Sequence, residues 1–320
     1  MKTIAVLTSG GDAPGMNACI RAITRSALSR GFKVIGVKRG YSGLIDGEFI
    51  PLTSRSVGNI LQTGGTILKT SRCPEFLTDN GFKKALENIK KAKIDGLIVI
   101  GGDGSYRGAY NLSKAGVKVV TVPGTIDNDL HYTDYTLGFD TAVNTIVQLV
   151  NNVRDTSLAH DRISVVEVMG AYCGDIALNV GAATGADYII VPEVKFEPKK
   201  LYEKLVNNTK NGKACSIVIL NEKVASAGDL AKMISKNTGL EVRPLVVGHI
   251  QRGGTPTADD RIMAVKFGVR AVELLSEDIG GRAIGIYADK VMDQPIERAI
   301  EEARRGFDME LYRMTQELSF

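Results

Sequence analysis

One short segment carries three side chains that could act together in catalysis. The segment is Pro123-Gly124-Thr125-Ile126-Asp127-Asn128-Asp129, and it follows an apolar run, residues 117–122, typical of a buried parallel strand. Thr125, Asp127 and Asp129 alternate, so in an extended backbone all three leave on the same side. A hydroxyl and two carboxylates would then meet beyond a strand's carboxyl end, where open α/β sheets bind ligands. The alternative is a polar turn that only caps a helix.

Two further predicted strands end in glycine-rich segments that suit phosphate binding. They read Thr8-Ser9-Gly10-Gly11-Asp12-Ala13-Pro14-Gly15 and Gly101-Gly102-Asp103-Gly104-Ser105-Tyr106-Arg107-Gly108. At such strand-to-helix junctions the backbone N–H groups and the positive helix end favour an anion, and glycine lets the backbone approach it. One such loop is commonly just a tight turn, but three in one sheet favour nucleotide binding. Asp103, flanked by glycines, suits Mg²⁺, which takes one or two carboxylates.

These loops differ from the common nucleotide motifs. The chain has no Gly-x-x-x-x-Gly-Lys-Ser/Thr sequence, and its second loop, Gly-x-Gly-x-x-x-Gly, is one residue longer than the dinucleotide fingerprint. The next strand ends in Val122-Pro123, without a carboxylate to bind a ribose. Both observations argue against an NAD-dependent oxidoreductase.

Short runs rich in valine and isoleucine alternate along the whole chain with stretches of helical period. Residues 16–27 and 142–153 show the i, i+3, i+4, i+7 spacing of amphipathic helices. This alternation predicts α/β architecture: two doubly wound (Rossmann-like) domains with mainly parallel sheets covered by helices. The predicted strands are residues 3–8, 33–37, 96–100, 117–122, 163–168, 188–191, 216–220, 245–248 and 283–287.

Length and composition predict a soluble protein of two packed domains. The chain has 320 residues, of which 44% are hydrophobic and 24% charged, with a net charge of +4. No basic block suggests nucleic acid, and no apolar stretch suggests a signal peptide or a membrane span. The four cysteines are dispersed, as are the three histidines, which predicts reduced thiols in the cytosol and argues against zinc: Cys19, Cys73, Cys173, Cys215, His131, His160 and His249.

Five motifs together resemble those of one family. TSGGDAPGMNACIR, VIGGDGSY, PGTIDND, RISVVEVMG and GHIQRGGTP occur in this order, at spacings similar to those of bacterial ATP-dependent 6-phosphofructokinase, and the resemblance covers essentially the whole chain. It implies a cytoplasmic homotetramer that uses Mg²⁺ and ATP to phosphorylate the 1-hydroxyl of fructose 6-phosphate in glycolysis. It also implies an ATP-binding domain at 1–138 plus 251–301 and a fructose-6-phosphate-binding domain at 139–250 plus 302–320.

The resemblance also implies roles for individual residues. Asp127 matches the family's general base, with Thr125 and Arg72 as further catalytic residues, and Asp103 and Asp129 match positions at the metal. The ATP-site matches are Gly11, Arg72, Cys73, Gly102, Asp103, Gly104, Ser105 and Gly108. The substrate-site matches are Thr125, Ile126, Asp127, Met169, Gly170, Ala171, Glu222, His249 and Arg252, with Arg162 and Arg243 contributed by a neighbouring subunit.

Several positions depart from the family pattern. Ala171 stands where arginine is usual, and Leu77 where relatives often carry a basic residue. An effector site between subunits, for ADP and phosphoenolpyruvate, is matched by Arg21, Arg25, Arg154, Gly185 and Lys213. Its other positions differ: Asp187 replaces the usual glutamate, and Ser54, Asn211 and Cys215 replace residues that are commonly basic. We therefore expect weakened regulation by these anionic effectors. The alternative for Arg21 and Arg25 is that they belong to no effector site and only form a solvated helix face.

Two other functions are compatible with the same motifs. Relatives that use pyrophosphate typically carry Asp at position 104 and Lys at position 124, whereas both residues are glycine here, which favours ATP. A sugar-phosphate sensor without turnover would not need Asp127 and Asp103. Asp has an ordinary pKa of about 3.9 and is a weak base, but a loose phosphoryl-transfer transition state needs the proton removed only late.

Overall fold

The computed structural model describes residues 2–301 and 306–319, which fall into two compact units. Unit 1 comprises Met1–Thr141 and Arg252–Arg304, and unit 2 comprises Ala142–Gln251 and Arg305–Phe320. These limits lie close to the predicted domain boundaries; which ligand each domain binds stays a prediction. Within the described ranges, no helix is long and apolar enough to cross a membrane.

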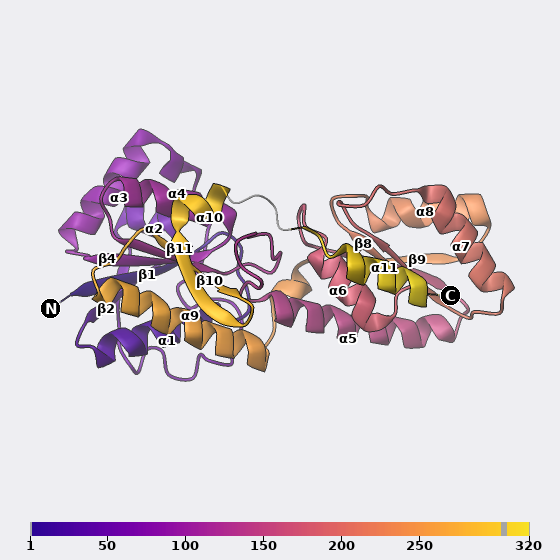
Figure 1. Ribbon diagram of the computed structural model, residues 1–320, viewed down its shortest axis with the longest axis horizontal. Helices are drawn as coiled ribbons and strands as arrows, with labels where there is room; N and C mark the ends of the chain where they lie inside the picture. Colours follow the sequence, from indigo (N-terminus) through magenta and orange to yellow (C-terminus); the bar gives the residue numbers. More distant parts are fainter. Residues whose placement is uncertain (1, 302–305, 320) are drawn as a thin grey trace. The chain divides into compact units, whose positions relative to one another are not determined.

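The sheet of unit 1 has seven strands in the order β11-β10-β5-β4-β1-β2-β3 (Figure 1). The five inner strands are parallel, and the edge strands β3 and β11, which were not predicted, are antiparallel. Both edges alternate apolar and polar residues or carry proline, so they lack the continuous apolar run of a buried strand. The bounds are β1 (Thr3–Ser9), β2 (Lys33–Val37), β3 (Phe49–Leu52), β4 (Gly96–Gly101), β5 (Val119–Pro123), β10 (Arg282–Tyr287) and β11 (Lys290–Pro295).

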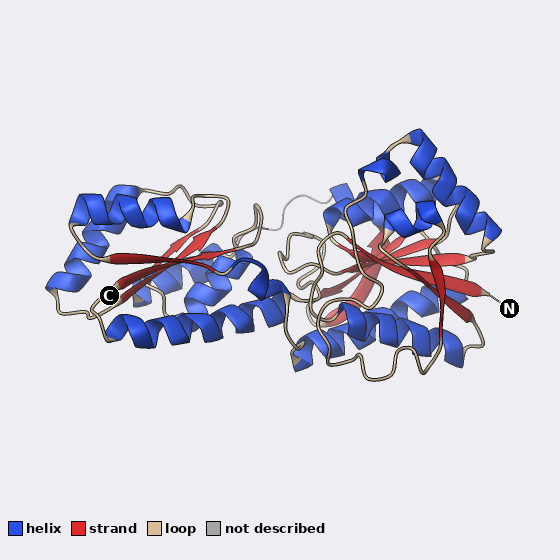
Figure 2. Ribbon diagram, turned by 180° about the vertical axis from the view of Figure 1, so that it is seen from behind, coloured by secondary structure: helices blue, strands red, loops and turns tan. Residues whose placement is uncertain are grey.

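Helices cover both faces of this sheet (Figure 2). Alternate strand residues enter different cores: Ala5 and Leu7 pack with the residues of α2, α3 and α4, while Ile4 and Val6 face the other side. On that side α1 and α9 approach closely, since a Cβ at Gly268 would lie 2.7 Å from the Ala22 Cβ. The bounds are α1 (Met16–Ser29), α2 (Tyr41–Asp46), η1 (Pro74–Leu77), α3 (Asp79–Lys91), α4 (Asp103–Lys114), α9 (Ala258–Ser276) and α10 (Ile296–Glu301).

Unit 2 has a parallel sheet of four strands in the order β7-β8-β6-β9. Its strands are β6 (Ile163–Val168), β7 (Tyr188–Ile190), β8 (Ser216–Asn221) and β9 (Val242–Val246). The strand predicted at 245–248 was wrong in position: the strand begins at Val242 and η2 (Gly248–Arg252) follows it. The start of this strand was missed because it is an edge strand that contains Pro244 and has partly or fully exposed side chains, so its sequence lacks a continuous apolar run. The helices are α5 (Phe139–Leu158), which begins in unit 1, α6 (Asp175–Thr184), α7 (Pro198–Lys210), α8 (Ala227–Thr238) and α11 (Met309–Leu318).

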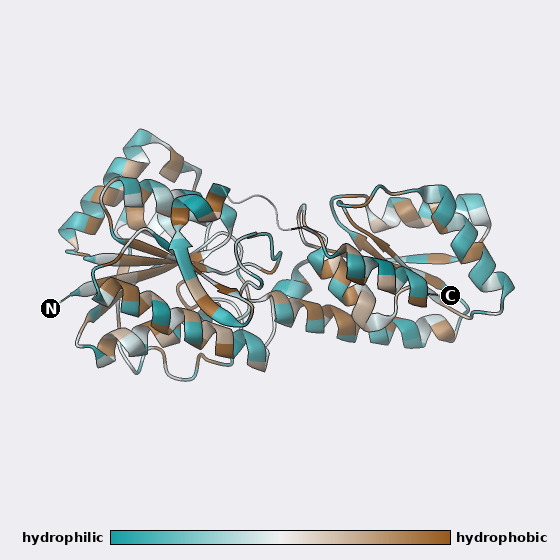
Figure 3. Cartoon of the chain, in the orientation of Figure 1, coloured by the Kyte–Doolittle hydropathy of each residue, from teal (hydrophilic) through white to brown (hydrophobic). Residues whose placement is uncertain are grey.

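Apolar residues concentrate on the strands and on the helix faces turned toward them (Figure 3). In unit 2, Val165, Val218 and Leu220 pack against Leu201 of α7 and Leu230 of α8. The predicted fold class, α/β with mainly parallel sheets covered by helices, is confirmed.

A long loop between β3 and η1 is held in place by the buried Asn17 of α1. The Asn17 amide donates to the carbonyls of Thr63 and Gly64 at 3.2 and 2.9 Å, and its oxygen accepts from Ile67 N at 2.8 Å. Farther along, Thr70 Oγ1 donates to Gly10 O at 2.8 Å. These bonds fix the start of the segment that carries Arg72 and Cys73.

We expect Asn17→Ala to lower the free energy of unfolding by about 1–3 kcal/mol, because it removes the buried side chain that forms three hydrogen bonds with the partly buried backbone of residues 63–67. Urea unfolding would measure the loss, and limited proteolysis would detect faster cleavage within residues 60–72. The control is Asn80→Ala, an exposed position on α3. Equal stability of the two variants would contradict this account of the loop.

Candidate active site

The carboxyl ends of β1, β4 and β5 open into one cavity of about 500 Å³. The three strands are neighbours in the sheet, and the chain proceeds from β1 to β2 on one side and from β4 to β5 on the other. Such a reversal of strand order leaves a crevice in which open α/β sheets bind ligands. The lining includes the predicted residues Gly11, Arg72, Cys73, Gly102, Asp103, Gly104, Ser105, Gly108, Thr125, Asp127, Asp129 and Arg252.

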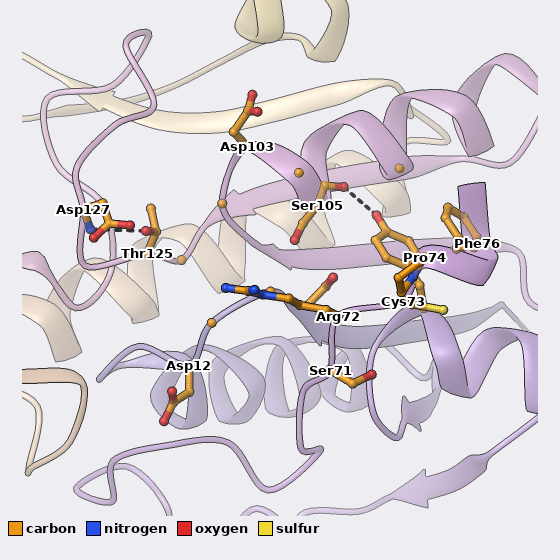
Figure 4. A pocket seen from close by; sticks show the side chains of 18 of the residues that line it. Asp12, Ser71, Arg72, Cys73, Pro74, Phe76, Asp103, Ser105, Thr125 and Asp127 are labelled. Atoms are coloured by element: carbon orange, nitrogen blue, oxygen red, sulfur yellow. Dashed lines mark hydrogen bonds between the residues drawn. The ribbon is translucent and has the colours of Figure 1, made fainter. Parts of the chain in front are cut away.

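The loop after β5 brings its polar side chains together by a route that differs from the expected one. The expected extended backbone is not present, since no strand covers residues 125–129 and Asn128 has a left-handed φ of 53°. Thr125, Asp127 and Asp129 nevertheless line the cavity. Asp127 N donates to Thr125 Oγ1 at 3.2 Å, and the two side chains lie next to each other (Figure 4). Ile126, predicted at the substrate site, is buried and is not part of the lining.

Residues 134–137 form hydrogen bonds that hold the loop after β5 in place. Thr136 Oγ1 donates to Thr125 O at 2.6 Å, and Leu137 N donates to Pro123 O at 3.0 Å. Asn128 Nδ2 donates to Asp134 O at 3.2 Å, which helps hold Asn128 in its left-handed conformation. Side chains and backbone together therefore fix the position of Thr125.

The two glycine-rich loops form the opposite wall of the cavity. Helix α4 begins after Gly102, no side chain caps this helix start, and residues 102–105 line the cavity, so the first turn of the helix lies at the cavity wall. A Cβ at Gly102 would lie 3.5 Å from Thr125 Cβ, which shows how close the β4 and β5 loops are. A Cβ at Gly11 would lie 1.9 Å from a guanidinium nitrogen of Arg252, so the glycine makes room for this arginine. Arg72 extends toward Thr125 and Asp127 (Figure 4).

An aromatic pair that the sequence did not predict closes one end of the cavity. The rings of Tyr41 and Phe76 stack with centroids 4.2 Å apart, and Tyr41 OH donates to Ser105 O at 2.5 Å. Burial raises the pKa of the Tyr41 phenol, so it stays a hydrogen-bond donor at neutral pH. A Cβ at Gly108 would lie 2.8 Å from the Tyr41 ring, so this glycine serves the packing of Tyr41. Ser9, Gly10 and Asp12 of the first glycine-rich segment also line the cavity, and so do Ser71 and Pro74, which the sequence did not predict. No local pattern marks Tyr41 or Phe76.

The two predicted metal positions lie on different loops of the same cavity. Asp129 follows β5, whereas Asp103 opens α4 and forms an exposed ion pair with Arg107 at 3.0 Å. In the part of the chain that the structure describes, no three acidic, histidine or cysteine side chains cluster as a metal cage. Mg²⁺ takes one or two carboxylates when substrate phosphates supply its remaining ligands, and the two carboxylates on this cavity fit that donor set.

In unit 2, the predicted sugar-phosphate residues occupy the two ends of one sheet. Met169, Gly170 and Ala171 follow β6, and Glu222 follows β8. At this end of the sheet, the side-chain oxygen of Gln251 accepts a hydrogen bond from Met169 N at 3.0 Å. His249 lies in η2. Arg162 precedes β6 at the other end, where it and Arg243 both form ion pairs with Glu241, at 2.8 and 2.6 Å. The six residues of β6 span about 20 Å, so unit 2 does not bring its own Arg162 to Met169.

The predicted effector residues are distributed over both units. Arg21 and Arg25 lie on α1 of unit 1. In unit 2, Arg154 donates to Thr184 O, and Gly185 ends α6 in a left-handed conformation. Asp187 is fully buried and accepts from Lys213 Nζ at 2.5 Å, Asn208 Nδ2 at 2.8 Å and Ile217 N at 2.9 Å. The charge of Lys213 is thus compensated within the chain.

Comparison with known families agrees with this geometry. A family model described as phosphofructokinase matches residues 3–275. The chain belongs to the phosphofructokinase family. It is 53% identical over 320 residues to a protein of Clostridium tetani and 52% identical over 319 residues to one of Alkaliphilus metalliredigens, and each match covers all of both chains. Both relatives are named ATP-dependent 6-phosphofructokinase. The resemblance seen in the sequence motifs is confirmed.

Solved structures of this family have the same fold. Phosphofructokinase from Saccharomyces cerevisiae matches with a TM-score of 0.89 at 32% identity; the match covers 100% of this chain and 48% of the yeast chain. A pyrophosphate-dependent phosphofructokinase from Marinobacter aquaeolei matches with a TM-score of 0.85 at 21% identity, covering 96% of this chain and 86% of that one. The second likeness shows the fold alone.

Two cavity glycines should respond differently to an added methyl group. A Cβ at Gly124 would lie 2.8 Å from Cγ2 of the buried Ile100, whereas a Cβ at Gly104 meets no atom within 4 Å. We expect Gly124→Ala to lower the free energy of unfolding by about 1–3 kcal/mol through overpacking. Gly104→Ala, in the first turn of a helix, should be neutral or slightly stabilising. Urea unfolding without ligands tests both, and the reverse order of stability would show that Gly124 has free space.

Proposed function

We propose that this chain transfers the γ-phosphoryl group of ATP to the 1-hydroxyl of fructose 6-phosphate, which gives fructose 1,6-bisphosphate and ADP and commits the sugar to glycolysis. The observation that carries the proposal is the meeting of Thr125 and Asp127 with two glycine-rich loops in one cavity. The full-length identity to relatives named ATP-dependent 6-phosphofructokinase supports this substrate pair. The new bond joins the sugar oxygen to γ-phosphorus, and the bond from γ-phosphorus to the β–γ bridging oxygen breaks.

In this proposal the residues of the β5 loop act on the acceptor. Asp127 orients the 1-hydroxyl and takes its proton as the oxygen attacks, and Thr125 binds the phosphoryl group in transfer. Arg72 and Arg252, which line the same cavity, neutralise negative charge on the phosphates. The uncapped start of α4 and the glycines at 11, 102 and 104 bind the phosphates of ATP through backbone N–H groups.

We propose Mg²⁺ as the metal and Asp103 and Asp129 as its protein ligands. When bound, Mg²⁺ would neutralise part of the negative charge of the ATP phosphates. Asp103 forms an exposed ion pair with Arg107 at 3.0 Å. Such a pair contributes little to stability, so the carboxylate would be available to hold the ion. Asp129 belongs to the loop of Asp127, which couples the metal position to the base.

For the sugar phosphate, we propose Arg252 together with Met169, Gly170, Ala171, Glu222 and His249. Arg162 and Arg243 lie at the other end of the unit 2 sheet, paired with Glu241. This separation within one chain supports the proposal that they serve the substrate of a neighbouring subunit, in a cytoplasmic homotetramer. The four cysteines are free thiols, as expected in a reducing compartment.

The choice of phosphate donor depends on two glycines. At position 104 the space is open, and we propose that the α-phosphate of ATP uses it. Position 124 has no room for a side chain beside Ile100, so the lysine typical of pyrophosphate-dependent relatives would not fit without repacking. Both features favour ATP over pyrophosphate.

A coupled assay with fructose 6-phosphate and Mg²⁺ should show turnover with ATP and none above background with pyrophosphate. Gly104→Asp should lower kcat/KM for ATP strongly, since its carboxylate repels the phosphates, whereas Gly104→Ala serves as the matched control for the lost glycine. Turnover with pyrophosphate but not with ATP would overturn the donor assignment. Binding of fructose 6-phosphate with no turnover by either donor would favour the sensor.

Replacement of the base should affect the rate and leave the cavity intact. We expect Asp127→Ser to lower kcat by about 10²–10⁴-fold, with a much smaller change in the KM for ATP, because general-base catalysis acts on the transition state. Steady-state kinetics measures both, and Asp79→Ser on the exposed start of α3 is the control. An unchanged kcat would remove Asp127 from the mechanism.

We further propose that regulation by ADP and phosphoenolpyruvate is weak in this chain. The ion pair of Lys213 with buried Asp187 at 2.5 Å takes up one of the few cations at the matched positions. We expect either effector to change the half-saturating concentration of fructose 6-phosphate by less than about 5-fold, the lower end of ordinary allosteric coupling. Saturation curves with and without each effector test this, and strong phosphoenolpyruvate inhibition relieved by ADP would contradict it.

A further inference from the structure

A buried carboxylate outside the cavity holds the start of α5. Asp260, in the first turn of α9, is completely buried. One of its oxygens accepts from Gly138 N at 2.7 Å, and the other accepts from Thr141 N at 2.9 Å and Thr141 Oγ1 at 2.5 Å. All three donors belong to the beginning of α5, so a side chain from a distant helix caps its N-terminus. A negative charge is favourable at this end of a helix.

Further hydrogen bonds join this carboxylate to the segment that carries Arg252. Thr257 N donates to Thr141 Oγ1 at 3.0 Å, and Thr257 Oγ1 donates to Asp140 Oδ2 at 2.5 Å. We call Asp140, Thr141, Thr257 and Asp260 the Asp260 junction. It fixes the start of α5 to the start of α9 at Ala258, and Arg252, which lines the cavity, lies shortly before this helix in the chain.

The residues directly before the junction contact two walls of the cavity. Thr136 Oγ1 donates to Thr125 O at 2.6 Å, and Leu137 N donates to Pro123 O at 3.0 Å. Gly138 has a φ of +99°, and a Cβ there would lie 2.8 Å from Ala13 Cβ, on the first glycine-rich loop. The segment 136–138 is therefore confined between the loop after β1 and the loop after β5, and Asp260 holds its far end.

We propose that Asp260 is a positioning residue for phosphoryl transfer, whose carboxylate anchors residues 136–141 and thereby keeps Thr125 and Asp127 in place. This inference rests on the proposed function for its effect on rate. Asp260 lines no part of the cavity, so it takes no part in bond making or proton transfer. A displacement of about 1 Å of a positioned group can cost as much as 10²-fold in rate.

The hydrogen bonds at Asp260 require a carboxylate, and an amide of the same shape would not serve. Both oxygens of Asp260 accept hydrogen bonds, so an amide in its place would point an NH₂ group at an N–H or O–H donor. Burial raises the pKa of Asp260 to about 6, with the hydrogen bonds from Thr141 and Gly138 opposing this shift and the charge of Asp140 on α5 adding to it. At neutral pH the carboxylate is ionised and accepts all three bonds.

The test compares matched pairs of variants in two measurements. Asp260→Asn removes the acceptor, and Asp259→Asn makes the same change at the exposed neighbouring position. Thr141→Val removes the hydroxyl that donates to Asp260, and Thr141→Ser keeps a hydroxyl at this position. We expect kcat to fall about 10- to 100-fold in Asp260→Asn and less in Thr141→Val, with the KM for ATP within about 3-fold of the parent. Asp259→Asn and Thr141→Ser should retain the parent kcat.

Hydrogen exchange of residues 123–137 is the second readout and does not depend on activity. We expect faster exchange there in Asp260→Asn and Thr141→Val than in their controls. Folded variants with parent-like exchange, or with parent-like kcat in an active enzyme, would overturn the proposal. If Asp260→Asn does not fold, the Thr141→Val and Thr141→Ser pair decides. If the parent turns over neither donor, the proposed function fails, and exchange alone still decides whether Asp260 anchors the loop.

Discussion

The parallel pairing of β1, β4 and β5 is the constraint on which the cavity depends. Parallel strands end at the same edge of a sheet, so these three neighbours bring together the loops that follow Ser9, Gly101 and Pro123. The chain leaves β1 and β4 in opposite directions across the sheet, and the helices that follow diverge and leave the crevice open. Glycine, threonine and aspartate from three separate loops then share one cavity.

The sequence predicted those features in which a residue type meets a local requirement of the backbone. Continuous valine and isoleucine runs predicted the buried strands, and glycine at three strand ends predicted an anion site, since both patterns follow from local requirements of the backbone. The edge strands β3 and β11 and the position of β9 were missed because exposed or proline-bearing edges lack that apolar signal. Tyr41 and Phe76 were missed because their stacking joins α2 to η1, two short helices with no shared sequence pattern.

In unit 2, an acidic residue holds Arg162 and Arg243 at the end of the sheet opposite to Met169 and Glu222. Glu241 pairs with both Arg162 and Arg243, which keeps two cations at the amino end of the sheet, the end opposite to Met169 and Glu222. An exposed ion pair contributes little to stability, and a dianionic phosphate is a stronger partner for arginine than a single carboxylate. These arginines are therefore available for exchange of partner, unlike Lys213, whose carboxylate partner Asp187 is buried and has two further donors.

Two of the non-glycine residues with a left-handed backbone, Asn128 and Ala171, lie in the loops after β5 and β6. Asn128 adopts a φ of 53° between two aspartates that line the cavity, and asparagine tolerates this left-handed conformation better than most residues. The turn lets Asp127 and Asp129 reach the same space although the loop is not extended. Such a conformation persists only if its surroundings hold it, and here the bonds from Asn128 to Asp134 and from Thr136 to Thr125 do so. Ala171 has a φ of 48° and no side chain that could form a compensating hydrogen bond. The loop after β6 is instead held by hydrogen bonds on both sides of Ala171: Met169 N donates to Gln251 at 3.0 Å, Cys173 N donates to Gly170 O at 2.8 Å, and Asn221 Nδ2 donates to Cys173 O at 3.0 Å.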